Sequence, residues 1–226
     1  MTNPPKIAAL VPMRHSSERV PQKNYRPFAG KPLYHHIIQT LLNCPQIDQV
    51  CIDTDSPFIL EDAPKHFPEV KLLVRPEHLR DGEISMNEVL LNATSQVKAD
   101  IYLQTHSTNP LLRSETISQA INQFLNSPDA DSLFGVTRLQ TRLYDAQGKA
   151  VNHDPNVLLR TQDLPPIYEE NSNIYLFKPE VLQQQKNRIG KQTIMFEIDR
   201  DEAWDIDEEV DFRIAELLYL YREGKA

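Results

Sequence analysis

Short apolar runs alternate with amphipathic segments along most of this 226-residue chain. A run that is apolar at nearly every position predicts a strand buried on both faces, whereas apolar residues three or four apart predict a helix. We expect strands at 7–11, 49–53, 70–74, 101–103 and 131–137. Strands separated by helices in this way predict a mostly parallel sheet with helices on both faces, that is, a three-layer α/β sandwich.

Local signals place the starts of the helices. Pro32 suits the first position of a helix, because proline lacks only an N–H that would have no partner there. Ser56, which is followed by proline, suits the start of a second helix. Ser85 and Ser114 are the expected N-caps of two more, since a serine hydroxyl accepts a hydrogen bond from the first turn.

The alternating pattern breaks at 138–170, which has few apolar runs and several turn signals. We interpret this segment as an excursion from the sheet: a flap, a small β subdomain or a dimerisation arm. Strands resume at 173–177 and 195–198, so the whole chain, 1–226, is predicted to form one domain with an insertion. A last helix follows Asp207, and its predicted apolar face consists of Val210, Ile214, Leu217, Leu218 and Tyr221.

Composition narrows the classes of partner. The formal net charge of −8 argues against a general nucleic-acid surface. No apolar run approaches the roughly 20 residues that span a bilayer, and the start of the chain lacks the apolar stretch of a signal peptide. We therefore expect a cytoplasmic protein with neither nucleic acid nor a membrane as a partner.

The loop at 12–31 is longer than an ordinary connection in an α/β unit. Ligands of such sheets bind beyond the carboxyl ends of the strands, where this loop joins 53–56, 75–85 and 104–113. It holds five Lys or Arg residues and one acid, Glu18. Either it holds an anion such as a triphosphate, or it is a solvated cationic surface. The candidate phosphate ligands are Arg14, Ser16, Ser17, Arg19 and Lys23.

An acidic segment near the C-terminus is the second candidate site. Residues 197–211 hold nine acids and one arginine. Asp205 and Asp207 are two positions apart, so in an extended segment both carboxylates face the same side and can share one cation. Such oxygen ligands suit Mg²⁺, which also contacts substrate phosphates. The alternative is that Asp207 caps the last helix and Asp205 is solvated.

Other candidate motifs are absent or weak. The sequence has neither the G-x-G-x-x-G of dinucleotide-binding folds nor the P-loop of nucleotide triphosphatases. Cys44 and Cys51 lack metal-ligand spacing, and we expect both to be buried thiols. His35 and His36 are adjacent, so their side chains diverge, and we interpret them as ordinary helix residues.

The opening loop reads Pro12-x-Arg14-x-x-Ser17-x-x-x-Pro21-x-Lys23-Asn24, and Gly30-Lys-Pro-Leu33 follows it. This pattern resembles the signature of the acylneuraminate cytidylyltransferase family, which makes CMP-sialic acid and related CMP-sugars and is allied to the CMP-Kdo synthetases. Six further matches follow in the family's order: Asp53-Thr-Asp-Ser56, Arg75-Pro-Glu77 with Ser85, Leu103-Gln104 with Thr108-Asn-Pro-Leu-Leu-Arg113, Arg160-Thr-Gln-Asp-Leu-Pro165, Asn171-Ser-Asn-Ile-Tyr175, and Asp205-Ile-Asp-Glu-Glu-Val-Asp211.

The resemblance implies a nucleotidyltransferase that transfers CMP from CTP to a 2-keto sugar acid, sialic acid-like or Kdo-like, and releases pyrophosphate. It implies a Rossmann-like fold of the nucleotide-diphospho-sugar transferase type. It also implies a homodimer in which 138–170 is the dimerisation segment.

The resemblance also implies roles for individual residues. Asp205 and Asp207 would carry Mg²⁺, and with Arg14 and Lys23 they form the expected catalytic set. The sugar acid would lie near Gln104, Arg160 and Asn171. With the loop candidates included, the expected nucleotide-binding residues are Arg14, Ser16, Ser17, Arg19, Lys23, Asn24, Arg75 and Ser85.

The chain departs from the family pattern beside the expected substrate. His15 and Ser16 replace two glycines, and Glu18 replaces a lysine, although Arg19 follows as in the Kdo-type pattern. Residues 106–107 are inserted in the Leu-Gln loop. These changes put the identity of the sugar in question more than that of the nucleotide. Two alternatives therefore remain: transfer from another nucleotide or to a sugar phosphate, or nucleotide binding without catalysis.

Overall fold

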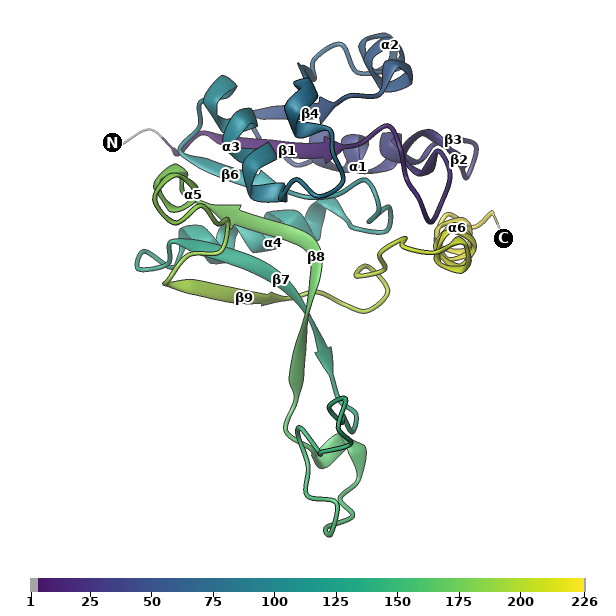
Figure 1. Cartoon of the computed structure of the whole chain (residues 1–226), viewed down its shortest axis with the longest axis vertical. Coiled ribbons are helices and arrows are strands. Elements are labelled where there is room, and N and C mark those ends of the chain that lie inside the picture. The colour runs from purple at the N-terminus through teal and green to yellow at the C-terminus, as the bar shows by residue number, and fades with distance from the viewer. Residues whose placement is uncertain (1–3, 226) are drawn as a thin grey trace.

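The computed structural model describes residues 4–225 and is built around one seven-stranded sheet (Figure 1). Neighbouring strands are parallel except where β8 pairs with β6 and β7, which confirms the predicted mostly parallel sheet. In spatial order the strands are β5 (Lys71–Val74), β4 (Gln49–Thr54), β1 (Ile7–Met13), β6 (Ile101–Gln104), β8 (Ile167–Phe177), β7 (Ser132–Leu139) and β9 (Thr193–Glu197).

Helices pack on both faces of the sheet, so the predicted three layers are confirmed. Along β1, Ala9 and Val11 belong to one core cluster, whereas Ala8 and Leu10 belong to another, because successive strand residues point to opposite faces. The first cluster receives α1, α2 and α4, and the second receives α3 and α5. The helices are α1 (Leu33–Leu42), α2 (Pro57–His66), α3 (Met86–Gln96), α4 (Ser114–Leu125), α5 (Pro179–Gln185) and α6 (Glu209–Arg222).

Local hydrogen bonds fix the starts of two helices as predicted. Ser85 Oγ accepts the Glu88 N–H at 3.3 Å while the Ser85 N–H donates to the Glu88 carboxylate at 3.2 Å, a capping box that opens α3. Ser56 caps α2. The other two predictions are wrong by one position: Ser114 is the first residue of α4 rather than its N-cap, and Pro32 precedes α1.

The last helix, α6, buries a different face from the predicted one. Phe212 and Ala215 are buried, whereas Val210 and Tyr221 are 58% and 78% exposed. The reason is a long-range contact. The Phe212 ring packs edge-on against Phe28, with ring centroids 5.5 Å apart. Phe28 belongs to a small hairpin of β2 (Pro27–Phe28) and β3 (Lys31–Pro32) inside the opening loop, so α6 covers that loop.

β7 and β8 extend as a two-stranded ribbon from which an arm projects (Figure 1). Their pairing ends at Leu139 and Ile167, so the arm consists of residues 140–166. The arm corresponds to the excursion expected at 138–170, and its role in dimerisation stays a prediction. Among residues 4–225, no helix is both long enough and apolar enough to cross a membrane.

Candidate functional site

A cavity of about 490 Å³ lies at the carboxyl ends of β1, β5 and β6, where ligands of such sheets bind. Its wall combines the opening loop with the segment just before α6, so residues 12–24 and 205–207 lie side by side there. Nine residues that the sequence nominated for nucleotide or metal line this cavity: Arg14, Ser16, Ser17, Arg19, Lys23, Asn24, Arg75, Asp205 and Asp207.

Ion pairs and hydrogen bonds hold the cationic loop against the acidic segment. Arg19 Nη2 lies 2.7 Å from Asp207 Oδ1, and Lys23 Nζ donates to the Ile206 carbonyl at 2.6 Å. Outside the cavity, Arg26 clamps Glu209 with bonds of 2.6 and 2.9 Å. The loop is therefore positioned by residues more than 180 positions away, which pre-organises its cations for an anionic ligand.

Lys23 is the most buried cation of the opening loop. Its side chain is 13% exposed, and Nζ lies 3.8 Å from Asp207 Oδ1. Burial lowers the pKa of Lys23, while the charges of Asp207 and Asp205 act in the opposite direction. A cation with so little water around it interacts strongly with a phosphate, because screening is weak there.

Asn24 holds the loop in shape. Its Nδ2 donates to the Arg14 carbonyl at 2.6 Å, and its Oδ1 accepts from Ser107 Oγ at 2.6 Å. These two bonds link the start of the loop, its middle and the segment after β6. Asn24 therefore fixes the backbone beside Arg14, and this is compatible with a role in nucleotide binding.

Asp205 has the features of a cation ligand. Its Oδ1 is buried and accepts no hydrogen bond from any residue within 4–225. Burial raises the pKa of Asp205, and Asp207 adds like-charge repulsion. A buried carboxylate oxygen without a partner is unfavourable, and a divalent cation would offset that energy. The carboxylates of Asp205 and Asp207 thus fit Mg²⁺, an ion that prefers oxygen ligands.

The alternative interpretation of Asp207 as a helix cap is wrong. The N-cap residue of α6 is Glu208, whose N–H donates to the Asp211 carboxylate at 2.7 Å. The Asp207 side chain instead faces Arg19, as described above. The Asp211 carboxylate also accepts the Asp207 N–H at 3.1 Å, so these bonds at the start of α6 involve the Asp207 backbone and not its side chain.

A family model described as cytidylyltransferase matches residues 8–226. This chain belongs to the cytidylyltransferase family. It is 27% identical to the pseudaminic acid cytidylyltransferase of Campylobacter jejuni over 95% of this chain and 96% of the relative. It is 26% identical to the CMP-N,N'-diacetyllegionaminic acid synthase of Legionella pneumophila over 94% and 96% of the two chains. A solved structure of CMP-2-keto-3-deoxy-manno-octonic acid synthetase complexed with CTP shares the fold at a TM-score of 0.72 and 17% identity, covering 96% and 99%.

Arg75 and Ser85, the two residues expected at the cytidine of this cytidylyltransferase, have different surroundings: the first lines the cavity and the second does not. Arg75 lines the cavity, yet it is only 2% exposed and its Nε donates to Asp53 Oδ1 at 2.5 Å. Ser85 is not among the lining residues; its hydroxyl is engaged by the capping box of α3, and its neighbour Met86 lines the wall instead. Arg75 thus forms a buried ion pair at the wall of the cavity, and the roles of Arg75 and Ser85 at the cytidine both stay predictions.

The three residues expected near the sugar do not line the cavity. Asn171 is buried and donates to Thr137 Oγ1 at 3.1 Å, and its neighbour Ser172 lines the cavity instead. Arg160 lies in the arm, where its 74% exposed side chain pairs with Asp163 at 2.7 Å. The sugar-binding roles of Gln104, Asn171 and Arg160 stay predictions.

Gln104 is fully buried but connects to the cavity through His106. Gln104 Oε1 accepts from Arg188 Nη1 at 2.6 Å, which leaves its amide N–H to donate to His106 Nε2 at 2.8 Å. The His106 ring proton is thereby placed on Nδ1. Burial, with the charges of Arg188 and Lys23, lowers the pKa of His106 to about 3, so the ring is neutral. His106 lines the cavity as a fixed, uncharged hydrogen-bonding group.

Sequence reasoning missed several residues that line the cavity, and it missed Arg188, which holds Gln104 behind the cavity wall. His106 and Ser107 were noted only as an insertion, and Asp81 to Ile84 had no motif at all. Arg188, whose guanidinium stacks 3.6 Å from the Tyr175 ring centroid, carried no signal because it follows a short unpredicted helix, α5. The Arg188–Gln104–His106 chain exists only because β6 and the turn after α5 meet in space.

Proposed function

We propose that this cytidylyltransferase transfers CMP from CTP to a 2-keto sugar acid of the nonulosonate class. The observation that carries the proposal is the single cavity that joins Lys23 and the cationic loop to Asp205 and Asp207. The relatives support the sugar class, because their names specify pseudaminic and diacetyllegionaminic acids. A Kdo-like acid is the second candidate, and a cytoplasmic location stays a prediction from composition.

The cations of the opening loop would hold the triphosphate. Arg14 and Arg19 can donate to phosphate oxygens in pairs, and Lys23 contributes a compact, largely buried charge in the wall of the cavity. Mg²⁺ held by Asp205 and Asp207 would neutralise phosphate charge when bound. The anomeric hydroxyl of the sugar attacks the α-phosphorus and loses its proton to solvent, the bond to the pyrophosphate oxygen breaks, and the loop cations stabilise the negative charge that develops on the leaving group.

The sugar would lie against the part of the cavity where this chain departs from the family pattern. His106 and Ser107 lie in the insertion, and both line the cavity. A neutral His106 with its proton on Nδ1 can donate to a hydroxyl or carbonyl oxygen of a sugar but adds no charge. Recognition there would depend on hydrogen-bond geometry, which discriminates strongly between sugars that have or lack the matching group.

A panel assay tests this function. Purified protein with CTP and Mg²⁺ is expected to release pyrophosphate when a nonulosonic acid is added, and not with sugar phosphates. CTP at 100 times its Kd is expected to raise the free energy of unfolding by about 2.7 kcal/mol, and equal concentrations of UTP, GTP or ATP by less. Turnover with another nucleotide or a sugar phosphate would contradict the proposal, and nucleotide binding without turnover on the whole panel would favour a non-catalytic protein.

We further propose that the arm forms a homodimer. Val157, Leu158 and Leu159 are a run of apolar residues that are 50%, 89% and 44% exposed. Leaving such a run in water is unfavourable, and a second copy of the arm would cover it. A dimer also bears on Arg160: it lies outside the cavity of its own chain, so a role at the sugar would require the cavity of the second copy.

Replacement of Leu158 by Asp is expected to convert a dimer into a monomer, because the charge would be buried in the interface without a partner. Light scattering after size-exclusion chromatography measures the change. Leu217→Asp is the matched control, since this leucine of α6 is also exposed (62%) but lies far from the arm in sequence. A monomeric wild-type protein, or a dimer that persists in Leu158→Asp, would contradict the arm as the interface.

A further inference from the structure

Three side chains of α1 and α2 converge outside the nucleotide cavity: His35, Asp62 and His66. One candidate ligand atom from each lies within 4.8 Å of the others. His35 Nε2 is 2.7 Å from Asp62 Oδ2, and His66 Nδ1 is 3.2 Å from Asp62 Oδ1. None of the three lines the cavity that holds Lys23 and Asp205.

The fold fixes this cluster and leaves one side open. Asp62 and His66 are four residues apart, so they share one face of α2. His35 comes from α1, which packs on the same face of the sheet as α2. The side chains of His35, Asp62 and His66 are 8%, 18% and 52% exposed, so the cluster is anchored inside and accessible from solvent.

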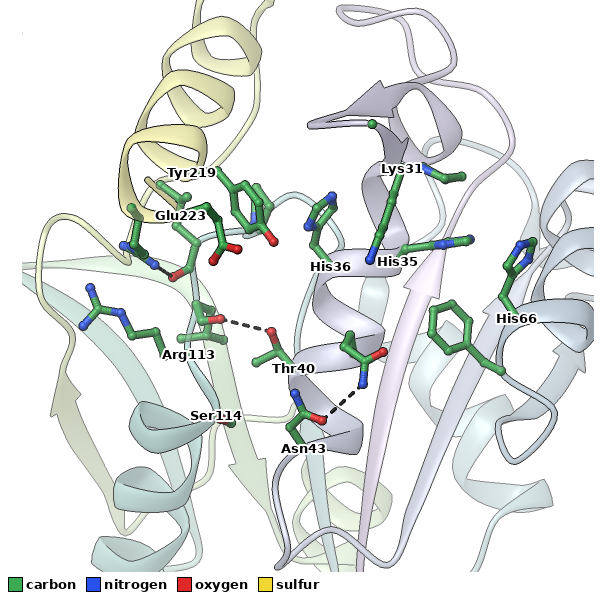
Figure 2. A pocket seen from close by; sticks show the side chains of 18 of the residues that line it. Lys31, His35, His36, Thr40, Asn43, His66, Arg113, Ser114, Tyr219 and Glu223 are labelled. Carbon is green, nitrogen blue, oxygen red and sulfur yellow. Dashed lines mark hydrogen bonds between the residues drawn. The ribbon is translucent and has the colours of Figure 1, made fainter. Parts of the chain in front are cut away.

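Figure 2 places His35 and His66 at one edge of a second hollow, of about 690 Å³, between α1, the start of α4 and the end of α6. His36 lines the same hollow, but its Nε2 lies 2.9 Å from the Phe28 carbonyl. His35 and His36 therefore contact different partners, because the side chains of adjacent helix residues diverge. The sequence could not reveal that the His35 side chain contacts Asp62 of α2.

Two imidazoles and one carboxylate are a donor set for a borderline divalent ion. Zn²⁺ is bound by such mixed nitrogen and oxygen ligands, whereas Mg²⁺ prefers oxygen alone. Both imidazoles would coordinate as neutral rings, each carrying its proton on the other nitrogen. The exposed side of the cluster leaves room for a water molecule to complete the coordination.

The Asp62 carboxylate is oriented by a hydrogen bond from a buried residue outside the cluster. Tyr34, which is fully buried, donates its hydroxyl to Asp62 Oδ2 at 2.5 Å. Bonds of this kind from outside the ligand set hold a metal ligand in position and are costly to remove. The cluster thus has three candidate ligands and a supporting hydrogen bond, which is more than the hydrogen bonding of two histidines requires.

We propose that His35, Asp62 and His66 bind one Zn²⁺ ion, independently of the Mg²⁺ expected at Asp205 and Asp207. The ion would cross-link α1 to α2, and α1 directly follows the opening loop. Lys31, beside these histidines in Figure 2, adds a positive charge that opposes the ion. Replacement of Lys31 by Met is therefore expected to tighten Zn²⁺ binding.

Calorimetric titration of the metal-free protein with Zn²⁺ tests the site, and the absorption spectrum of bound Co²⁺ reports nitrogen ligands. We expect one ion per chain in the wild type. Tyr34→Phe, which removes only the supporting bond, is expected to weaken binding by about 10-fold to 100-fold, and His66→Gln by more. His36→Gln is the matched control and is expected to bind as the wild type does.

Two results would overturn the site. One is a His66→Gln protein that binds Zn²⁺ as tightly as the wild type. The other is loss of binding in Asp205→Asn, which would place the ion in the nucleotide cavity. Circular dichroism of each metal-free variant checks its folding, and His66 is exposed enough that its replacement leaves the core intact.

Discussion

Replacement of Asp205 by Asn is expected to lower the rate of pyrophosphate release by about 10²-fold to 10³-fold, the effect of removing one pre-organised charge-stabilising group. Asparagine keeps the shape of the side chain but removes the negative charge that would hold Mg²⁺. The loss is expected mainly in kcat rather than in KM for CTP, because Arg14, Arg19 and Lys23 still hold the phosphates. Steady-state kinetics with CTP and a nonulosonic acid measure the two constants separately.

The same variant has an expected effect on stability, with the opposite sign. Burial raises the pKa of Asp205 above its ordinary value of 3.8, so the ionised carboxylate destabilises the metal-free protein as the pH rises. Metal-free Asp205→Asn is therefore expected to melt at a higher temperature than the wild type at neutral pH. The difference is expected to vanish as the pH falls well below 3.8, where the folded and unfolded wild-type chains both bind the proton.

Glu197→Gln is the control for Asp205, because Glu197 belongs to the same acidic segment but is exposed on β9 and does not line the cavity. It is expected to leave both rate and melting temperature unchanged. An Asp205→Asn protein with wild-type activity would contradict the role of this carboxylate. An unstable one would contradict the inference that its buried oxygen lacks a partner.

Replacement of Arg75 by Met is expected to lower the free energy of unfolding by about 3–5 kcal/mol, because it leaves the buried Asp53 charge without its partner. The two side chains are only 2% and 3% exposed, and their contact is 2.5 Å long. Asp53 Oδ2 already has no hydrogen-bond partner within the described part of the chain. Urea denaturation followed by circular dichroism measures the change.

Two further variants separate the buried charge from other effects of the substitution. Arg75→Met combined with Asp53→Leu removes both charges and is expected to recover most of the lost stability. Arg160→Met removes an arginine from an exposed pair with Asp163, whose contact is 2.7 Å long, and its effect is expected to be below about 1 kcal/mol. A single Arg75→Met protein as stable as the wild type would mean that Asp53 binds a proton instead.

Local patterns in the sequence predicted the central strands of the sheet and the N-caps of α2 and α3. β1, β4 and β6 are short and mostly apolar because both faces of each strand are covered, so their composition identifies them. The caps at Ser56 and Ser85 were predictable because the bonds that they make span only three residues. The motif order likewise placed the chain among the cytidylyltransferases before any geometry was known.

The face of α6 and the partners of Gln104 were not predictable in this way. Apolar spacing located α6, but Phe28 in the opening loop decides which residues of the helix are buried. Gln104 was expected beside the sugar, yet Arg188 engages its carbonyl and turns its amide towards His106. In both cases the deciding neighbour is more than 80 positions away, and side-chain periodicity carries no information about it.

By itself the sequence determined that a cationic loop and an acidic segment exist, because charge is a property of each residue. Only the tertiary structure decided that they form one site. The bond from Lys23 to the Ile206 carbonyl joins residues 183 positions apart, and the sheet between them sets that geometry. The tertiary structure also decided the role of His35, which the sequence alone predicts to be an ordinary helix residue. It becomes a candidate metal ligand because α2 brings Asp62 and His66 to it.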